Sequence, residues 1–135
     1  MYGELVSETV EQMVFGYASQ AVEQARAQKM ELDYSEASVE RLEALLSEGP
    51  AADAETCKMW GAYFGEVVRR KFGGDWSIET YPGQQFATLT LTVQGAKLFP
   101  SMKIYRRLTQ GASEDLRTFY ASVKEKLGKQ SSRVN

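Results

Sequence analysis

The stretch from Cys57 to Trp76 constrains the fold of this chain more than any other segment. At ~100° per residue, its apolar side chains cover more than half of a helix circumference. The pair Gly73-Gly74 ends this helix, because glycine readily adopts the left-handed conformation that a helix end requires. The centre of the apolar face is formed by Cys57, Trp60, Phe64, Val68 and Phe72. The stretch predicts a buried central helix that is followed directly by a strand. Gly61 and Gly65 flank the apolar stripe and predict that another element packs closely there.

Helical and alternating patterns divide the rest of the chain. Apolar residues at helical spacing predict further helices over residues 4–29, 36–48, 100–110 and 114–127. Alternation predicts strands over residues 76–81 and 86–93, joined by a turn at 82–85, and a short third strand over 96–99.

This order of elements predicts an α+β fold. Three N-terminal helices precede a small antiparallel β-meander of two or three strands, and two C-terminal helices follow it. Thr88, Thr90 and Thr92 share one face of the second strand. Threonine-rich faces usually meet solvent, so we expect the helices to pack on the other face only. We expect one domain over residues 1–128 and a polar C-terminal tail over 129–135.

The composition excludes several common kinds of active site. The chain has no histidine, which excludes Ser-His-Asp triads and histidine-ligated zinc. Its single cysteine excludes an intramolecular disulfide and paired-thiolate metal sites. Cys57 lies on the apolar helix face, where we expect a buried, inert thiol. We therefore expect no bound metal or organic cofactor, and a net charge of −2 argues against general nucleic-acid binding.

The sequence shows no membrane-spanning or targeting segment. No apolar run reaches the ~18 residues of a transmembrane helix. The N-terminal residues Met1-Tyr2-Gly3-Glu4 lack the basic and apolar regions of a signal peptide. We expect a cytoplasmic protein.

Two segments carry a resemblance to a known group of proteins. The first is Leu32-Asp33-Tyr34-Ser35-Glu36-Ala37-Ser38, followed by Leu42-Glu43-Ala44-Leu45-Leu46. The second is Gly61-Ala62-Tyr63-Phe64-Gly65-Glu66-Val67, with Gly73-Gly74-Asp75-Trp76. Together they resemble small bacterial single-domain proteins of unknown function, some of which occur in toxin-immunity settings. The resemblance implies no catalytic residues, and it leaves an immunity-like role as an expectation.

Glu66 is the candidate for acid-base chemistry. It lies beside aromatic residues on a mostly buried helix, a setting that can raise the pKa of a carboxyl group. A small enzyme that uses Glu66 as its acid or base is therefore one hypothesis. The alternative is a structural ion pair between Glu66 and Arg70, which are four residues apart on the helix.

Two arginine doublets are candidates for anion binding. Arg69-Arg70 ends the central helix, and Arg106-Arg107 lies on the next helix. If these helices lie side by side, the doublets form one basic patch with Lys103, Trp76 and Tyr105. Such a patch would bind an anion or a nucleotide, whereas separate doublets would simply be solvated.

Aromatic residues favour a third hypothesis. The chain has seven tyrosines and two tryptophans, and Tyr2, Tyr34, Tyr63 and Tyr81 lie on otherwise polar arcs or loops. Such side chains dominate the energetics of protein–protein contacts, although partly buried tyrosines with a hydrogen-bonded hydroxyl give the same pattern. We favour a non-catalytic protein-binding domain whose partner is another protein, such as a toxin, or a second copy of the chain. The expected contact surface is formed by Tyr63 and Glu66 or by the threonine face of the sheet.

Overall fold

The computed structural model describes the backbone of residues 9–133 and the side chains of residues 9–128. The predictions for residues 1–8, which include Tyr2, and for residues 134–135 lie outside this range. The predicted unbroken helix over 4–29 was wrong, because Thr9 has extended backbone and caps a helix that runs over Val10–Ala27. The described elements, in chain order, are α2 (Val10–Ala27), α3 (Ser38–Ser47), α4 (Ala54–Phe72), β1 (Asp75–Thr80), β2 (Ala87–Val93), β3 (Ala96–Leu98), α5 (Pro100–Gln110), the 3₁₀ turn η1 (Gly111–Glu114) and α6 (Leu116–Arg133).

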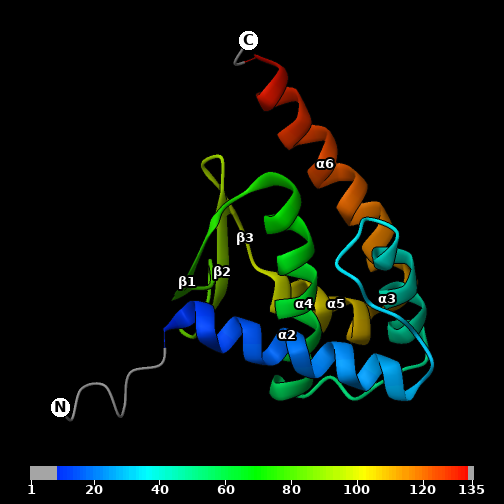
Figure 1. Cartoon of the computed structure of the whole chain (residues 1–135). Coiled ribbons are helices and arrows are strands. Elements are labelled where there is room, and N and C mark those ends of the chain that lie inside the picture. The colour runs from blue at the N-terminus through cyan, green and yellow to red at the C-terminus, as the bar shows by residue number, and fades with distance from the viewer. Residues whose placement is uncertain (1–8, 134–135) are drawn as a thin grey trace, which may run out of the picture.

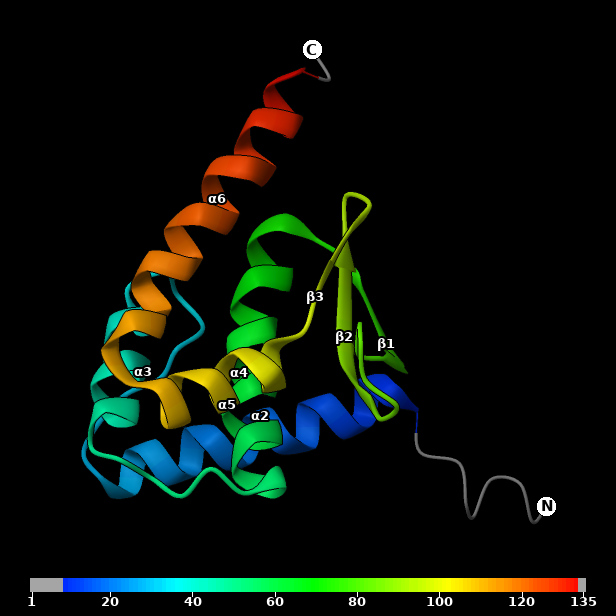
Figure 2. The ribbon, with the colours of Figure 1, turned by 180° about the vertical axis from the view of Figure 1, so that it is seen from behind.

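The predicted α+β fold is confirmed. Within residues 9–133, three helices precede a three-stranded antiparallel sheet, and two helices follow it. Figures 1 and 2 show that α4 stands between the sheet and the pair formed by α3 and α6. Helix α2 runs across α4, and both α4 and α5 contact the central strand β2. None of the helices in the described range is long and apolar enough to span a membrane.

Tight turns determine the order of the strands in the sheet. Residues of β1 pair with β2 from Asp75↔Thr92 to Thr80↔Ala87, and β2 pairs with β3. The turn between β2 and β3 consists of Gln94 and Gly95, which both have positive φ angles, of 51° and 83°. A two-residue hairpin with two positive φ angles matches the natural twist of a β-ribbon. The predicted short third strand is therefore confirmed.

The ends of α4 follow the predicted capping pattern. Asp53 is the N-cap residue, and its carboxylate accepts a hydrogen bond from the backbone amide of Thr56. Gly73 ends the helix with a φ angle of 85°, a conformation that few other residues adopt without strain.

The predicted end of α6 was wrong. The helix continues through Gly128 to Arg133, where the sequence predicted a polar tail from residue 129. A single glycine costs a helix only about 1 kcal/mol, and no proline follows it. The start of α6 also differs from expectation, because Asp115 accepts hydrogen bonds from the amides of Arg117 and Thr118.

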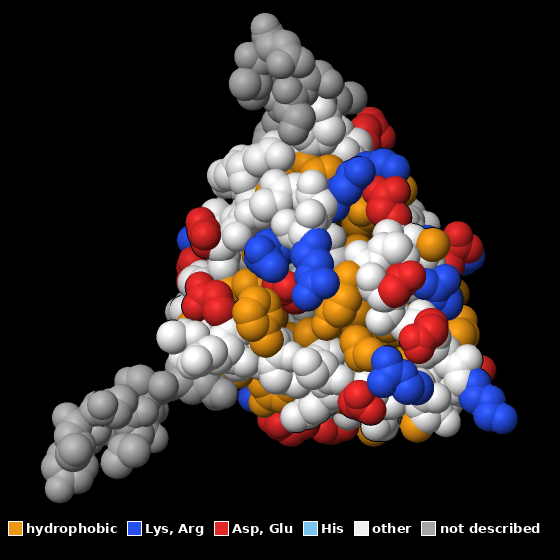
Figure 3. Space-filling view, viewed as in Figure 1, with side chains coloured by type: hydrophobic (Ala, Val, Ile, Leu, Met, Phe, Trp, Pro, Cys, Tyr) orange, Lys and Arg blue, Asp and Glu red, His pale blue; other side chains and the backbone are white. Residues whose placement is uncertain are grey.

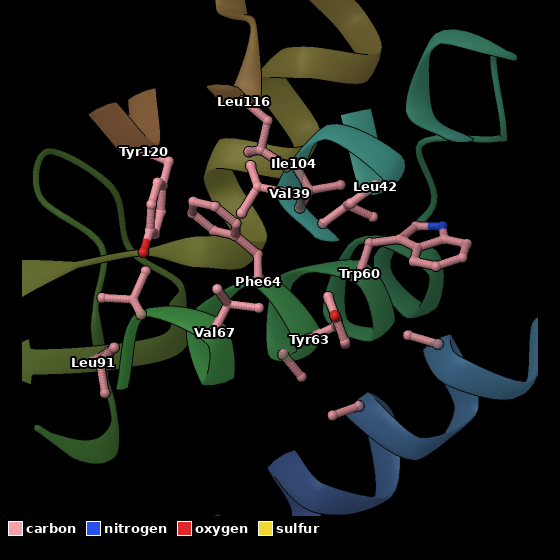
Figure 4. Close-up of a cluster of buried hydrophobic side chains, with 14 of the residues drawn as sticks. Val39, Leu42, Trp60, Tyr63, Phe64, Val67, Leu91, Ile104, Leu116 and Tyr120 are labelled. Carbon is pink, nitrogen blue, oxygen red and sulfur yellow. The ribbon is translucent and has the colours of Figure 1, made fainter. Parts of the chain in front are cut away.

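Helix α4 forms the centre of the hydrophobic core. Every residue from Trp60 to Val68 is buried, which confirms the predicted core positions Trp60, Phe64 and Val68. Figure 4 shows the cluster that surrounds it, with side chains from α3, α5, α6 and β2. Those labelled in the figure are Val39, Leu42, Leu91, Ile104, Leu116 and Tyr120.

Two glycines allow neighbours to approach α4 closely, as predicted. A Cβ atom at Gly61 would lie 2.7 Å from the Cα atom of Ser101 in α5. A Cβ atom at Gly65 would lie 2.2 Å from the indole ring of Trp76 in β1. Both distances are shorter than a carbon–carbon contact permits, so a larger residue at either position would force its neighbour away.

The threonine face of the sheet is less exposed than predicted. Thr90 is fully buried, and Thr88 and Thr92 are half-buried. Glu79 lies opposite Thr88, and Lys97 lies opposite Thr92, on the same face as the threonines. The ion pair between Glu79 and Lys97 therefore joins the two outer strands across the position of Thr90. The expectation that this whole face meets solvent was wrong, because Thr90 is fully buried.

We predict that Gly61→Ala destabilises the protein by about 1–3 kcal/mol, because the added methyl group meets the backbone of α5. The matched control is Gly16→Ala in α2, where a Cβ atom would meet open space. That substitution should stabilise the protein by about 0.5–1 kcal/mol through helix propensity. Chemical denaturation measures both changes. A Gly61→Ala variant as stable as the wild type would contradict the close contact between α4 and α5.

Candidate functional site

Glu66 is fully buried and engaged in hydrogen bonds. Its Oε2 atom accepts from the Nε atom of Arg69 and from the indole Nε1 atom of Trp76, both at 2.7 Å. Its Oε1 atom accepts from Nη2 of Arg69 at 3.0 Å and from Nε of Arg70 at 3.4 Å. The carboxylate thus joins the end of α4 to the start of β1. Of the predicted site residues, the structure brings Glu66, Arg70 and Trp76 together.

The pKa of Glu66 is shifted in the opposite direction from the one that acid-base catalysis requires. Burial by itself raises the pKa of this carboxyl group. The hydrogen bonds from Arg69 and Trp76, together with the positive charge of Arg69, outweigh burial and leave the pKa below its ordinary value. The hypothesis of a raised pKa was therefore wrong, and Glu66 remains ionised at neutral pH.

Tyr63 is also an internal structural residue. Its side chain is fully buried. Its hydroxyl accepts a hydrogen bond from the backbone amide of Tyr34 at 2.8 Å and donates one to Oγ of Ser38 at 2.7 Å. Tyr34 has a φ angle of 65°, so the hydrogen bond that its amide donates to Tyr63 supports a strained loop position. The prediction that Tyr63 and Glu66 form an exposed contact surface was wrong, because neither side chain reaches the surface.

Arg70 is held in place at the surface by its neighbours. Its guanidinium carbon lies 3.6 Å from the centre of the Tyr34 ring, and that ring packs on Tyr63 at 4.7 Å. A cavity of about 460 Å³ lies beside the stacked side chains of Arg70 and Tyr34, and its lining includes Arg70, Lys71 and residues 34–37.

The two arginines of the second doublet form separate ion pairs, Arg107 with Glu43 and Arg106 with Glu114. Arg107 is buried and donates from Nε to both oxygens of the buried carboxylate of Glu43, at 2.9 and 3.1 Å. Glu43 also accepts the backbone amide of Leu116 at 3.0 Å, so it links α3, α5 and α6. Hydrogen bonding to Glu43 raises the pKa of Arg107 above its ordinary value. Arg107 is therefore a structural cation.

The other basic residues of α5, Lys103 and Arg106, form ion pairs with Glu114. Lys103 donates to this carboxylate at 2.8 Å and Arg106 at 3.3 Å. Arg106 also donates to the hydroxyl of Tyr81 at 2.8 Å.

The two doublets lie at different ends of β1. Arg69 and Arg70 meet the carboxylate that Trp76 contacts, whereas Arg106 contacts Tyr81. Trp76 and Tyr81 are on the order of 17 Å apart along the strand. The structure therefore does not form the single basic patch that the sequence suggested.

An apolar cavity lies elsewhere, at the start of α4. It has a volume of about 480 Å³ and lies between α4, α5 and the loop that joins β1 to β2, segments that can be followed in Figure 2. Two aromatic side chains in its lining are strongly exposed: Phe86 by 44% and Tyr105 by 43%. This cavity was not predicted from the sequence. The pattern that could have indicated it is the apolar residue Phe86 at the end of the polar turn 82–85.

The cavity lining contains the thiol of Cys57 and the hydroxyl of Ser101, which differ in their capacity to react or to bind a ligand. Burial, together with the nearby carboxylate of Asp53, raises the pKa of the Cys57 thiol to about 11. The thiol stays protonated at neutral pH and is a poor nucleophile. The buried hydroxyl of Ser101 has no hydrogen-bond partner in the described part of the chain. A buried hydroxyl without a partner is costly and would gain from a polar atom of a ligand.

Neither the arrangement of possible metal ligands nor the likeness to known proteins assigns a function to these residues. Within the described residues, no group of three or more cysteine, aspartate or glutamate side chains is arranged to hold a metal ion. Comparison with protein-family models, with curated proteins and with solved structures found no match.

We predict that Glu66→Gln destabilises the protein by about 1–3 kcal/mol at neutral pH. This is less than the ~3–5 kcal/mol typical when a fully buried ion pair is broken, because Arg69 and Arg70 reach solvent. The folded-state pKa of Glu66 lies below its ordinary value of 4.5. Its stabilising contribution is therefore present above that value and is lost as the pH falls through the lowered folded-state pKa.

Chemical denaturation between about pH 6 and about pH 3 measures this contribution. The difference in unfolding free energy between wild type and Glu66→Gln should shrink as the pH falls. A difference that stays constant over this range would show that the charge of Glu66 does not stabilise the fold.

Proposed function

We propose that this chain is a small, non-catalytic protein-binding domain that holds an apolar segment of a partner protein in the cavity beside α4 and α5. The observation that carries the proposal is the exposure of Phe86 and Tyr105 in the lining of that cavity. Exposed aromatic side chains around an apolar cavity are the usual energetic centre of a protein interface.

The character of the lining supports an apolar occupant. Met102 adds a flexible thioether beside the aromatic rings, and such side chains adapt to ligands of different shape. Lys58, the charged residue in this lining, is paired with Glu55 at 3.3 Å. The cavity therefore offers apolar surface without an unpaired charge, and a neutral segment with one or two bulky side chains suits it.

The enzyme hypothesis has less support. Glu66 is enclosed and ionised, and the thiol of Cys57 is protonated at neutral pH. Neither group has the accessibility and the pKa that acid-base or nucleophilic catalysis requires.

The resemblance to small bacterial proteins extends the proposal to the cellular setting. It favours a cytoplasmic domain that neutralises a toxin, in which case the partner segment belongs to that toxin. A second copy of the chain is the alternative partner.

Selection of peptides from a displayed random library on the immobilised full chain tests the proposal. We expect enriched peptides with bulky apolar residues. Their affinity should fall about tenfold or more for Phe86→Ala and Tyr105→Ala, because both substitutions remove exposed contact area without opening a cavity in the core. The matched control is Phe15→Ala on α2, since Phe15 is 47% exposed but lies outside the cavity lining.

Three outcomes would contradict the proposal. The selection could enrich no peptide, or the enriched peptides could bind Phe86→Ala and Tyr105→Ala as tightly as the wild type. Sedimentation could instead reveal a dimer that Tyr105→Ala dissociates, which would identify a second copy of the chain as the occupant.

A further inference from the structure

Arg70 is held in one orientation by two different contacts. Its Nε atom donates to the buried carboxylate of Glu66, and the face of its guanidinium group stacks on Tyr34. It donates no further hydrogen bond within the described range, so its terminal amino groups are free for a ligand. An arginine fixed in this way loses little conformational entropy when it binds a planar anion with two parallel hydrogen bonds.

The cavity next to Arg70 contains further hydrogen-bond donors. Lys71 lines it, and the ammonium group of this lysine has no hydrogen-bond partner among residues 9–128. The lining also includes Glu36 and Ala37, just before α3, whose backbone amides donate no hydrogen bond in the part of the chain that the structure describes. These amides lie at the positive end of a ten-residue helix and would add to the attraction for an anion.

The carboxylate of Glu36, which lines the cavity, already has hydrogen-bond partners within the protein. Glu36 accepts hydrogen bonds from the hydroxyl of Tyr120 at 2.9 Å and from Nζ of Lys124 at 3.2 Å. The bond from Tyr120 is the main reason that the pKa of Glu36 lies below its ordinary value. Glu36 therefore remains ionised and paired, and it leaves Arg70 and Lys71 to face the cavity.

The local balance of charge is opposite to that of the whole chain. The cavity lining includes two cations, Arg70 and Lys71, and one carboxylate, Glu36, although the chain carries a net charge of −2. Figure 3 shows lysine and arginine side chains near the middle of this face, over α4 and beside hydrophobic surface. A local excess of positive charge on an acidic protein points to an anionic ligand.

We propose that the cavity between the end of α4 and residues 34–37 binds the carboxylate of an acidic side chain of a partner protein. This inference rests on the proposed protein-binding function and adds a second contact, separate from the apolar cavity. A singly charged carboxylate suits the site better than a doubly charged phosphate, because the ionised Glu36 in the lining repels the second charge. Arg70 supplies the bidentate contact, and Lys71 adds charge at the rim.

Titration of the ¹⁵N-labelled full chain with a glutamate tripeptide, blocked at both ends, tests this site by NMR. We expect saturable shifts for the backbone amides of residues 35–38 and for Nε of Arg70. Affinity should fall about tenfold for Arg70→Lys, which keeps the charge but loses the bidentate geometry. It should fall about threefold for Lys71→Gln. The matched control is Arg26→Gln on α2, where an exposed arginine is paired with Glu23 and should not affect binding.

The design separates loss of binding from loss of folding. Lys71 is exposed, and its charge is the smallest of the causes that lower the pKa of Glu36, so Lys71→Gln should unfold at close to the temperature of the wild type. The proposal is overturned if the wild type shows no saturable shifts, or if Arg70→Lys and Lys71→Gln bind the tripeptide unchanged. Tighter binding of inorganic phosphate at matched ionic strength would overturn the choice of a carboxylate. The probe does not enter the apolar cavity, so failure here leaves the test with Phe86→Ala and Tyr105→Ala unaffected.

Discussion

The close packing of Trp76 on Gly65 determines much of this structure. Because Gly65 has no side chain, the indole ring lies directly on α4, and its N–H group reaches the carboxylate of Glu66. One residue thus packs β1 against the central helix and satisfies a buried charge. Glu66 in turn holds Arg69 and Arg70 at the end of α4. The sheet, the core and the basic surface all depend on this contact.

The internal polar groups are therefore structural, and binding depends on the surfaces that they support. Glu66 and Glu43 are buried carboxylates: Glu66 joins α4 to the strand that follows it, and Glu43 joins α3 to α5 and α6, which are distant in sequence. Arg69 and Arg107 are engaged in these bonds, and the two arginine doublets do not form a shared anion patch. Two accessible features of the described residues are relevant to binding: the apolar cavity with its exposed aromatic rings, and the terminal amino groups of Arg70 beside their own cavity. Both are consistent with contacts to another protein.

Periodicity predicted the elements well, because it depends only on local spacing. The apolar stripe of α4, its Asp53 cap and the closely packed Gly61 and Gly65 all follow from neighbouring residues. Contacts between residues distant in sequence could not be predicted from local spacing. The Glu43–Arg107 pair joins residues 64 positions apart, and nothing in either local pattern indicates the other. Tyr63 lies outside the predicted core stripe, yet the loop around Tyr34 covers it, and no periodic pattern specifies the path of that loop.

Native-state hydrogen exchange of the full chain tests most directly whether α4 is the element on which the fold depends. The backbone amides of residues 62–68 are buried throughout, so they should exchange only through global unfolding. Their exchange free energy should then equal the unfolding free energy from chemical denaturation. Exchange of these amides at a clearly lower free energy, with α2 or α6 protected longer, would contradict a structure that is built around α4.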